Sequence, residues 1–161
     1  MTAKQELSRF VIKKQQAAEA EAIMRARLDK DAEKILTLKS SLILPSIALD
    51  GMPHGHASKD KIAEVLAEID LILRAAQERV DKVMTMQNEA FIIMGEIYAE
   101  IQKVHNATYR LLLIRRFINN LSWTQVADVL SKDCGKDYSP SYVRNNLQYK
   151  ALKAFEEANK C

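Results

Sequence analysis

Between Ile62 and Thr108, apolar side chains recur in alternating steps of four and three residues. Twelve of the fourteen positions in this series are apolar, and only Gln87 and Thr108 interrupt it. A period of about 3.5 residues sustained over about seven heptads is typical of a coiled coil, so the pattern predicts one long helix over residues 59–108. The large apolar residues of this seam are Ile62, Leu66, Ile69, Leu73, Val80, Val83, Met94, Ile97, Ile101 and Val104.

Residues 1–43 form a second predicted helical segment. No glycine or proline occurs between Gln5 and Ser40, and alanine, glutamate, lysine and glutamine dominate this stretch. Its apolar stripe is uneven, which leaves two candidate partners for the seam of residues 59–108. The seam pairs with another copy, making the protein a homo-oligomer, or packs against the N-terminal helix of its own chain, or does both.

Residues 44–58 separate these helices and are predicted to form a loop. The segment holds two of the three prolines and two of the four glycines of the chain. Ser58 has the side chain of an N-cap for the helix that follows. His54 and His56 could ligate a metal, but no third or fourth ligand has a suitable spacing. We therefore expect a polar loop and no metal site.

Residues 109–161 carry the signals of short, capped helices. Asn119 and Asn120 follow an apolar helix, and asparagine is a residue type that tolerates the left-handed backbone of a tight turn. Ser122 and Gln125 have the spacing of a capping box, in which each side chain bonds the backbone N–H of the other residue. The side chains of this helix that we expect to face inward are Trp123, Val126, Ala127 and Leu130.

A further helix is predicted over residues 139–155. Ser139 is the expected cap, and Pro140 occupies the first helical position, where the missing N–H has no cost. The connection before it, residues 131–138, is longer than the three or four residues usual in a helix-turn-helix. The expected buried stripe of this helix is Val143, Leu147, Ala151 and Phe155.

The outer face of helix 139–155 has the chemistry of a DNA-recognition helix. Arginine can form two hydrogen bonds with guanine, and asparagine or glutamine can do so with adenine. The candidate residues for base readout are Ser141, Tyr142, Arg144, Asn145 and Gln148. The candidate residues for phosphate contact are Thr124, Gln125, Ser139, Arg115, Arg116, Lys150 and Lys153. The sequence thus predicts an all-α fold with an N-terminal helix, a long coiled-coil helix and a C-terminal helix-turn-helix domain at residues 109–161 that binds double-stranded DNA.

The distribution of charge supports this prediction. The net charge is +2 over residues 1–58, −3 over residues 59–108 and +4 over residues 109–161. A basic C-terminal segment beside an acidic helix is the distribution that contact with nucleic acid requires.

The order of these segments resembles the RinA/ArpU-type transcriptional regulators of phages and prophages of Gram-positive bacteria. The resemblance rests on the loop Asp50-Gly51-Met52-Pro53-His54-Gly55, on the long helix after it, and on Leu121-Ser122-Trp123-Thr124-Gln125-Val126-Ala127. The closing Lys150-Ala151-Leu152-Lys153 looks like the end of the fourth region of sigma factors. What the resemblance implies is activation of a phage operon, often that of the late packaging and structural genes.

Other function classes lack their signals in the sequence. No apolar run approaches the roughly 18 to 20 residues of a membrane span, and the polar start of the chain has no secretory signal, so we expect a cytoplasmic protein. The resemblance to phage and prophage regulators implies a bacterial host and association with the nucleoid. Cys134 and Cys161 have no histidine close by in sequence, and no glycine-rich phosphate loop occurs, so we expect neither an enzyme nor a cofactor. Two alternatives stay open: an adaptor that contacts RNA polymerase and binds DNA weakly, and a structural coiled-coil protein of phage assembly.

Overall fold

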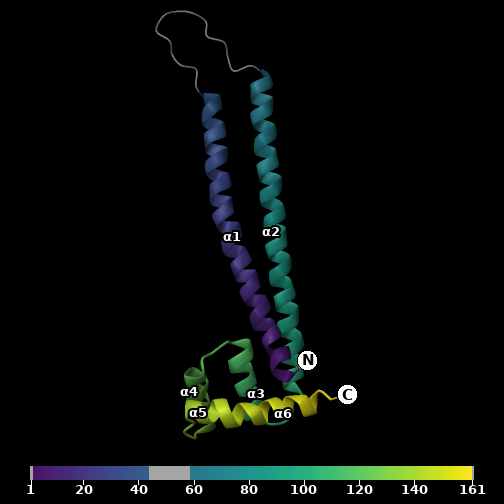
Figure 1. The fold of residues 1–161 in the computed structure, drawn as a ribbon, viewed down its shortest axis with the longest axis vertical. Coiled ribbons are helices and arrows are strands. Elements are labelled where there is room, and N and C mark those ends of the chain that lie inside the picture. The colour runs from purple at the N-terminus through teal and green to yellow at the C-terminus, as the bar shows by residue number, and fades with distance from the viewer. Residues whose placement is uncertain (1, 44–58, 161) are drawn as a thin grey trace, which may run out of the picture. The chain divides into compact units, whose positions relative to one another are not determined.

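The structure is a computed structural model that describes residues 2–43 and 59–160, and every regular element in these ranges is helical. The all-α prediction is therefore confirmed for this part of the chain. The predicted loop at residues 44–58, which includes His54, His56 and Ser58, lies outside the described residues, as does Cys161. In chain order the elements are α1 (Ala3–Ile43), α2 (Lys59–Gln102), α3 (Ala107–Leu113), the π-helical turn η1 (Ile114–Ile118), α4 (Trp123–Cys134), α5 (Pro140–Tyr142), the π-helical turn η2 (Val143–Leu147) and α6 (Gln148–Ala158) (Figure 1).

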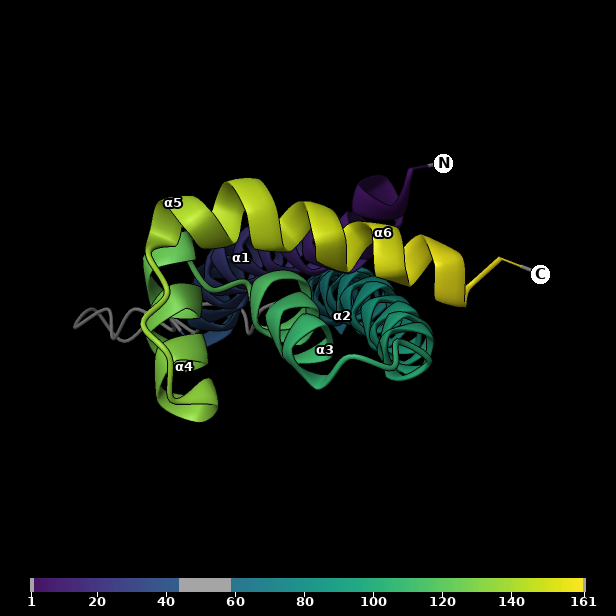
Figure 2. The same ribbon diagram turned by 90° about the horizontal axis from the view of Figure 1, so that it is seen from below.

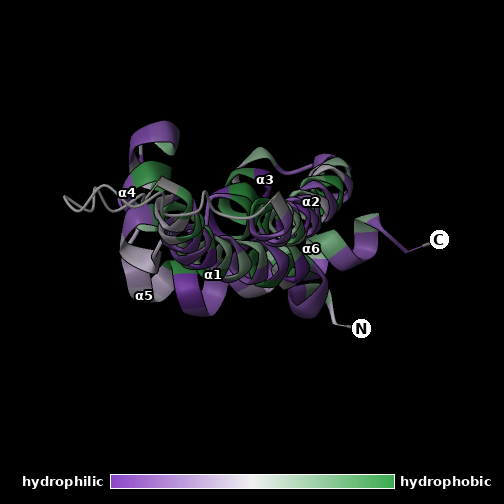
Figure 3. Cartoon of the chain, turned by 90° about the horizontal axis from the view of Figure 1, so that it is seen from above, coloured by the Kyte–Doolittle hydropathy of each residue, from purple (hydrophilic) through white to green (hydrophobic). Residues whose placement is uncertain are grey.

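The chain divides into two compact units. The first, here called the pair unit, is Ala18–Thr85, and the second, called the core unit, combines Met1–Ala17 with Met86–Cys161. Hydrophobic and hydrophilic residues alternate along the helices of each unit, as the helical period requires of elements that bury one side (Figure 3). In the parts of the chain that are described, none of the helices combines the length and the apolarity that a membrane crossing needs.

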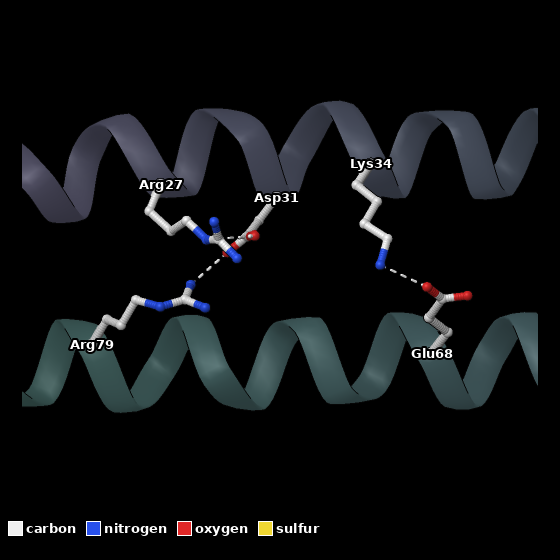
Figure 4. Close-up of polar contacts among 5 residues, drawn as sticks. All are labelled: Arg27, Asp31, Lys34, Glu68 and Arg79. Carbon is white, nitrogen blue, oxygen red and sulfur yellow. Dashed lines mark hydrogen bonds and ion pairs between the residues drawn. The ribbon is translucent and has the colours of Figure 1, made fainter.

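In the pair unit, α1 and α2 lie side by side and run in opposite directions (Figure 1). Asp31 of α1 is buried, and its carboxylate forms ion pairs with Arg79 of α2 and with Arg27 of its own helix (Figure 4). Lys34 and Glu68 form a second ion pair between the helices, with 2.7 Å between Nζ and Oε1. These contacts join the two helices of the same chain.

The predicted seam is only partly buried in the pair unit. Val83 is buried as expected, but Val65, which the seam omits, is buried as well. The side of α2 that packs on α1 is therefore rotated toward Val65, the side that also carries Glu68 and Arg79 with their ion pairs to α1. The seam positions that this rotation leaves exposed are Ile62 (40%), Leu66 (56%) and Leu73 (54%).

The core unit has one hydrophobic core, to which α1, α2, α3, η1, α4, η2 and α6 contribute side chains. Figure 2 shows the ribbons of α3, α4, α5 and α6 in this unit. The seam residues Ile97 and Ile101 are fully buried there, and Met94 packs against the same core. This part of the seam thus packs inside its own chain. The largest fully buried side chains of the unit are Phe155, Leu7, Ile97, Ile101, Leu112, Leu113 and Leu130.

The long helix ends at Gln102, earlier than the predicted residue 108. Asn106 caps α3 by accepting a hydrogen bond from the backbone N–H of Tyr109 at 3.1 Å. Arg110 then fixes the break, because its Nη1 donates to the carbonyl oxygens of Val104 and His105 at 2.7 and 3.1 Å. Val104 is buried, but in this connection and not in a helical seam.

Two π-helical turns set the register of the C-terminal helices. In η2 the backbone N–H of Gln148 donates a hydrogen bond to the carbonyl oxygen of Val143, five residues back. In η1 the backbone N–H of Asn119 donates in the same way to the carbonyl oxygen of Ile114. The buried stripe Val143, Leu147, Ala151 and Phe155 repeats every four residues. An α-helix has 3.6 residues per turn, so this stripe would drift around it, and a wider π turn reduces the drift.

Candidate nucleic-acid interface

The start of α4 has the predicted capping box. Ser122 Oγ accepts a hydrogen bond from the backbone N–H of Gln125 at 3.3 Å, and Gln125 Oε1 accepts one from the backbone N–H of Ser122 at 2.9 Å. Asn120, in the turn before it, has a φ of 53°, which is the left-handed conformation expected from its residue type. The local prediction for this turn and helix start is confirmed.

The connection between α4 and α5 is shorter than predicted. α4 continues through Cys134 and ends at Gly135, whose φ of 64° is left-handed and favours glycine. The Oγ atom of Ser139 caps the next helix by accepting from the N–H of Tyr142 at 3.2 Å, and Pro140 is its first residue, as predicted. The predicted turn at 131–138 is therefore wrong: only Gly135–Ser139 lies between the helices.

The inward faces of both helices are as predicted. Val126, Ala127 and Leu130 of α4 are buried, and so is the stripe from Val143 to Phe155. Trp123 is half-buried and packs against the core from the edge. Helix α4 therefore packs against α5 and η2, and α6 packs against α3, which fixes the direction of the polar faces that remain outside.

Four of the five candidate base-readout residues are exposed. Ser141, Tyr142, Arg144 and Asn145 all face solvent, and Gln148 is half-buried. The Tyr142 ring stacks on the ring of Tyr138 with 6.3 Å between centroids.

The candidate phosphate residues fall into two groups. Five of them are exposed: Thr124, Gln125, Ser139, Lys150 and Lys153. Of these, Gln125 and Ser139 already use their side chains to cap helices. The other two, Arg115 and Arg116, are half-buried.

Arg115 and Arg116 lie in η1, close in sequence to the turn before α4. Arg116 Nη1 donates to the carbonyl oxygen of Leu121 at 2.7 Å, and its guanidinium lies over the Trp123 ring, 4.7 Å from the centroid. Arg115 Nε is buried and has no hydrogen-bond partner among the described residues. Arg116 therefore supports the fold in addition to any contact that it makes with a ligand.

A cleft of about 320 Å³ opens beside η2 and the start of α6. Arg116, Arg144 and Gln148 line it together with residues of the first turns of α1. Its full lining is Lys4, Ser8, Val11, Ile12, Arg116, Phe117, Asn120, Trp123, Arg144 and Gln148. Sequence reasoning did not find Lys4 and Ser8, because nothing in the local pattern of α1 links them to residues more than a hundred positions away.

No group of three or more histidine, cysteine, aspartate or glutamate side chains in residues 2–43 and 59–160 could hold a metal ion. The cleft brings polar side chains of α1, η1, η2 and α6 together around a concave surface. Comparisons with models of protein families, with curated proteins and with solved structures find no match to this chain.

Proposed function

We propose that the protein is a sequence-specific DNA-binding regulator of transcription. In this proposal α4 and the helix formed by α5, η2 and α6 are the two helices of a helix-turn-helix, and the second one enters the major groove. The observation that carries it is the exposed polar face at the start of that helix, Ser141, Tyr142, Arg144 and Asn145, held outward by a buried stripe on the opposite side. Recognition helices meet base edges with their N-terminal residues, which are the residues exposed here.

The charge of the C-terminal segment supports the same function. Residues 109–161 carry a net charge of +4, which favours approach to the phosphate backbone. The resemblance to RinA/ArpU-type regulators supports the more specific proposal of an activator of a phage or prophage operon that acts in the cytoplasm of a bacterial host.

Self-association is part of this proposal, and the exposed side of α2 supports a second copy as the partner. From Asn88 to Gln102 this side presents a stripe of uncharged exposed residues, bordered by the exposed Glu89 and Glu96: Asn88, Phe91, Ile92, Gly95, Tyr98, Ala99 and Gln102. Phe91 and Ile92 are 66% and 63% exposed. An uncharged apolar face complements another uncharged face, and the same face of a second chain meets that condition. A symmetric dimer would present two recognition helices to half-sites separated by about one DNA turn of 34 Å or a multiple of it.

The test is selection of bound fragments from a sheared prophage-bearing genome by the purified full chain, at about 50 and 200 mM salt, because binding to phosphates alone collapses over that range. We expect one or a few discrete sites to survive the higher salt. Asn145→Ala should reduce the enrichment of those sites, whereas Gln16→Ala, an exposed amide on α1, should not. Uniform recovery that disappears with salt would overturn specific readout. Co-purification with RNA polymerase in that case would support the adaptor alternative.

A further inference from the structure

The cleft beside η2 collects positive charge from three separate elements. Lys4 comes from the first turn of α1, Arg116 from η1 and Arg144 from η2. No aspartate or glutamate lines the cleft. Like charges repel, so bringing three cations to one concave surface without a carboxylate is unfavourable for the fold by itself. An anion that enters the cleft removes this cost.

The remaining lining suits an anion with several oxygen atoms. Ser8, Asn120 and Gln148 add a hydroxyl and two amides, which can donate hydrogen bonds to such oxygens. Trp123 is the first residue of α4, so the positive end of that helix also lies at the cleft. A phosphate group, with its charge and its oxygen atoms, matches these donors.

The Arg116 side chain is already oriented before such a ligand binds. Its guanidinium is oriented by the Trp123 ring and by the hydrogen bond of Nη1 to the Leu121 carbonyl. A guanidinium carries five N–H donors, and this bond uses one of them. A side chain that is already oriented loses less conformational freedom when a ligand binds.

We propose that this cleft binds a phosphate group of the DNA backbone, and that Lys4 of α1 is one of its ligands. The DNA source of the phosphate rests on the proposed function, while the phosphate chemistry rests on the cleft itself. The proposal gives Arg144 a phosphate contact in place of the base contact expected from the sequence, because it shares the cleft with Lys4 and Arg116. It also makes the N-terminal helix part of the DNA-binding surface. Phosphate contacts of this kind set the orientation of a recognition helix and carry no sequence information themselves.

The single tryptophan of the chain makes the cleft directly observable. Trp123 is the only tryptophan and lies in the cleft wall, so its fluorescence reports a ligand that binds there. Three proteins are compared: the wild type and the variants Lys4→Ala and Lys30→Ala. Each is titrated with a random-sequence DNA duplex and, separately, with inorganic phosphate. Lys30 is an exposed lysine outside the cleft. Lys30→Ala therefore changes the net charge by the same amount as Lys4→Ala but leaves the cleft unaltered. The duplex titration is repeated at several salt concentrations.

We expect the duplex to change the Trp123 emission and Lys4→Ala to bind it more weakly than Lys30→Ala does. The slope of log affinity against log salt should decrease by about 1 in Lys4→Ala, as it does when one phosphate contact is lost, and should stay unchanged in Lys30→Ala. Equal slopes for the two variants would overturn the proposal. A response of Trp123 to inorganic phosphate but not to the duplex would overturn the DNA source and identify a free anion as the ligand.

The failure of this proposal can be told from the failure of the proposed function. If wild-type protein selects discrete genomic sites while Lys4→Ala has an unchanged salt slope, the regulator function stands and the cleft is not a backbone contact. If no discrete site is selected but the duplex still binds in a Lys4-dependent manner, the phosphate site stands and sequence-specific readout fails.

Discussion

The guanidinium of Arg116 lies over the indole ring of Trp123 at 4.7 Å from its centroid, and the same side chain donates a hydrogen bond to the Leu121 carbonyl. This pair spans the turn from η1 to α4 and connects the end of one helix to the start of the next. Arginine suits the position because its planar group can stack and donate a hydrogen bond at the same time.

Arg116→Lys should therefore lower the free energy of unfolding by about 1 kcal/mol, since a lysine keeps the charge but loses the planar stacking. Urea denaturation followed by Trp123 fluorescence measures this loss. Arg74→Lys, in an exposed ion pair with Asp70 on α2, should change the free energy by less than about 0.5 kcal/mol. An equal effect of both variants would show that the stacking contributes nothing.

The ion pairs of the pair unit should differ in their contribution to stability. Asp31 has a side chain that is 12% exposed and is bound by Arg79 and Arg27, whereas Lys34 and Glu68 are 56% and 44% exposed. Asp31→Ala should lower the free energy of unfolding by about 1–3 kcal/mol, because it removes charge-assisted contacts that are shielded from water. Lys34→Ala should cost less than about 1 kcal/mol. Hydrogen exchange of the backbone amides in Ala18–Thr85 measures both effects locally, and a larger effect of Lys34→Ala would contradict this order.

Glu100 should make the stability of the core unit depend on pH. Burial raises the pKa of its carboxyl, and the neighbouring Glu6 carboxylate raises it further. The folded chain therefore binds this proton more tightly than the unfolded chain, so stability decreases as the pH rises through the interval between the usual pKa and the raised one. Glu100→Gln should have a higher melting temperature than wild type at pH 7, and the difference should vanish well below the usual glutamate pKa of about 4.3, where the carboxyl is protonated in both states.

The control for this prediction is Glu78→Gln, an exposed glutamate on α2. It should change the melting temperature little at either pH. A melting temperature of Glu100→Gln below that of wild type at pH 7 would show that the carboxylate stabilises the fold through contacts that outweigh its burial.

Gly95 provides a test of self-association that leaves the single chain intact. A Cβ at this position would meet no atom within 4 Å, so Gly95→Ala should raise the stability of the helix by about 0.5–1 kcal/mol. Gly95→Lys should also fold, but it places a charge in the middle of the uncharged face of α2. We expect it to shift the protein from dimer to monomer in analytical ultracentrifugation, whereas Gln16→Lys on α1 should leave the dimer unchanged. A wild-type protein that is monomeric at all concentrations would end this proposal.

The sequence by itself determined the features that depend on neighbours a few residues away. The capping box of Ser122 and Gln125 and the cap and proline at Ser139 and Pro140 are present as predicted. Of the two asparagines expected to allow a left-handed turn, Asn120 is the one that adopts it. These features are local because a helix leaves its first N–H groups unpaired, and the side chain that satisfies them lies within three residues. The buried stripes of the short helices follow equally from the helical period.

Only the tertiary structure decided which side of α2 packs on α1, where α2 ends, and that Lys4 lies with Arg116 and Arg144 at one cleft. The heptad pattern describes an apolar seam but does not identify the partner that covers it, and the partner in each unit includes the chain's own α1. The end of α2 depends on Arg110 reaching back to two carbonyl groups, and the cleft depends on elements more than a hundred residues apart. Contacts of this kind arise from the path of the whole chain through a shared core, and no local pattern of residues records that path.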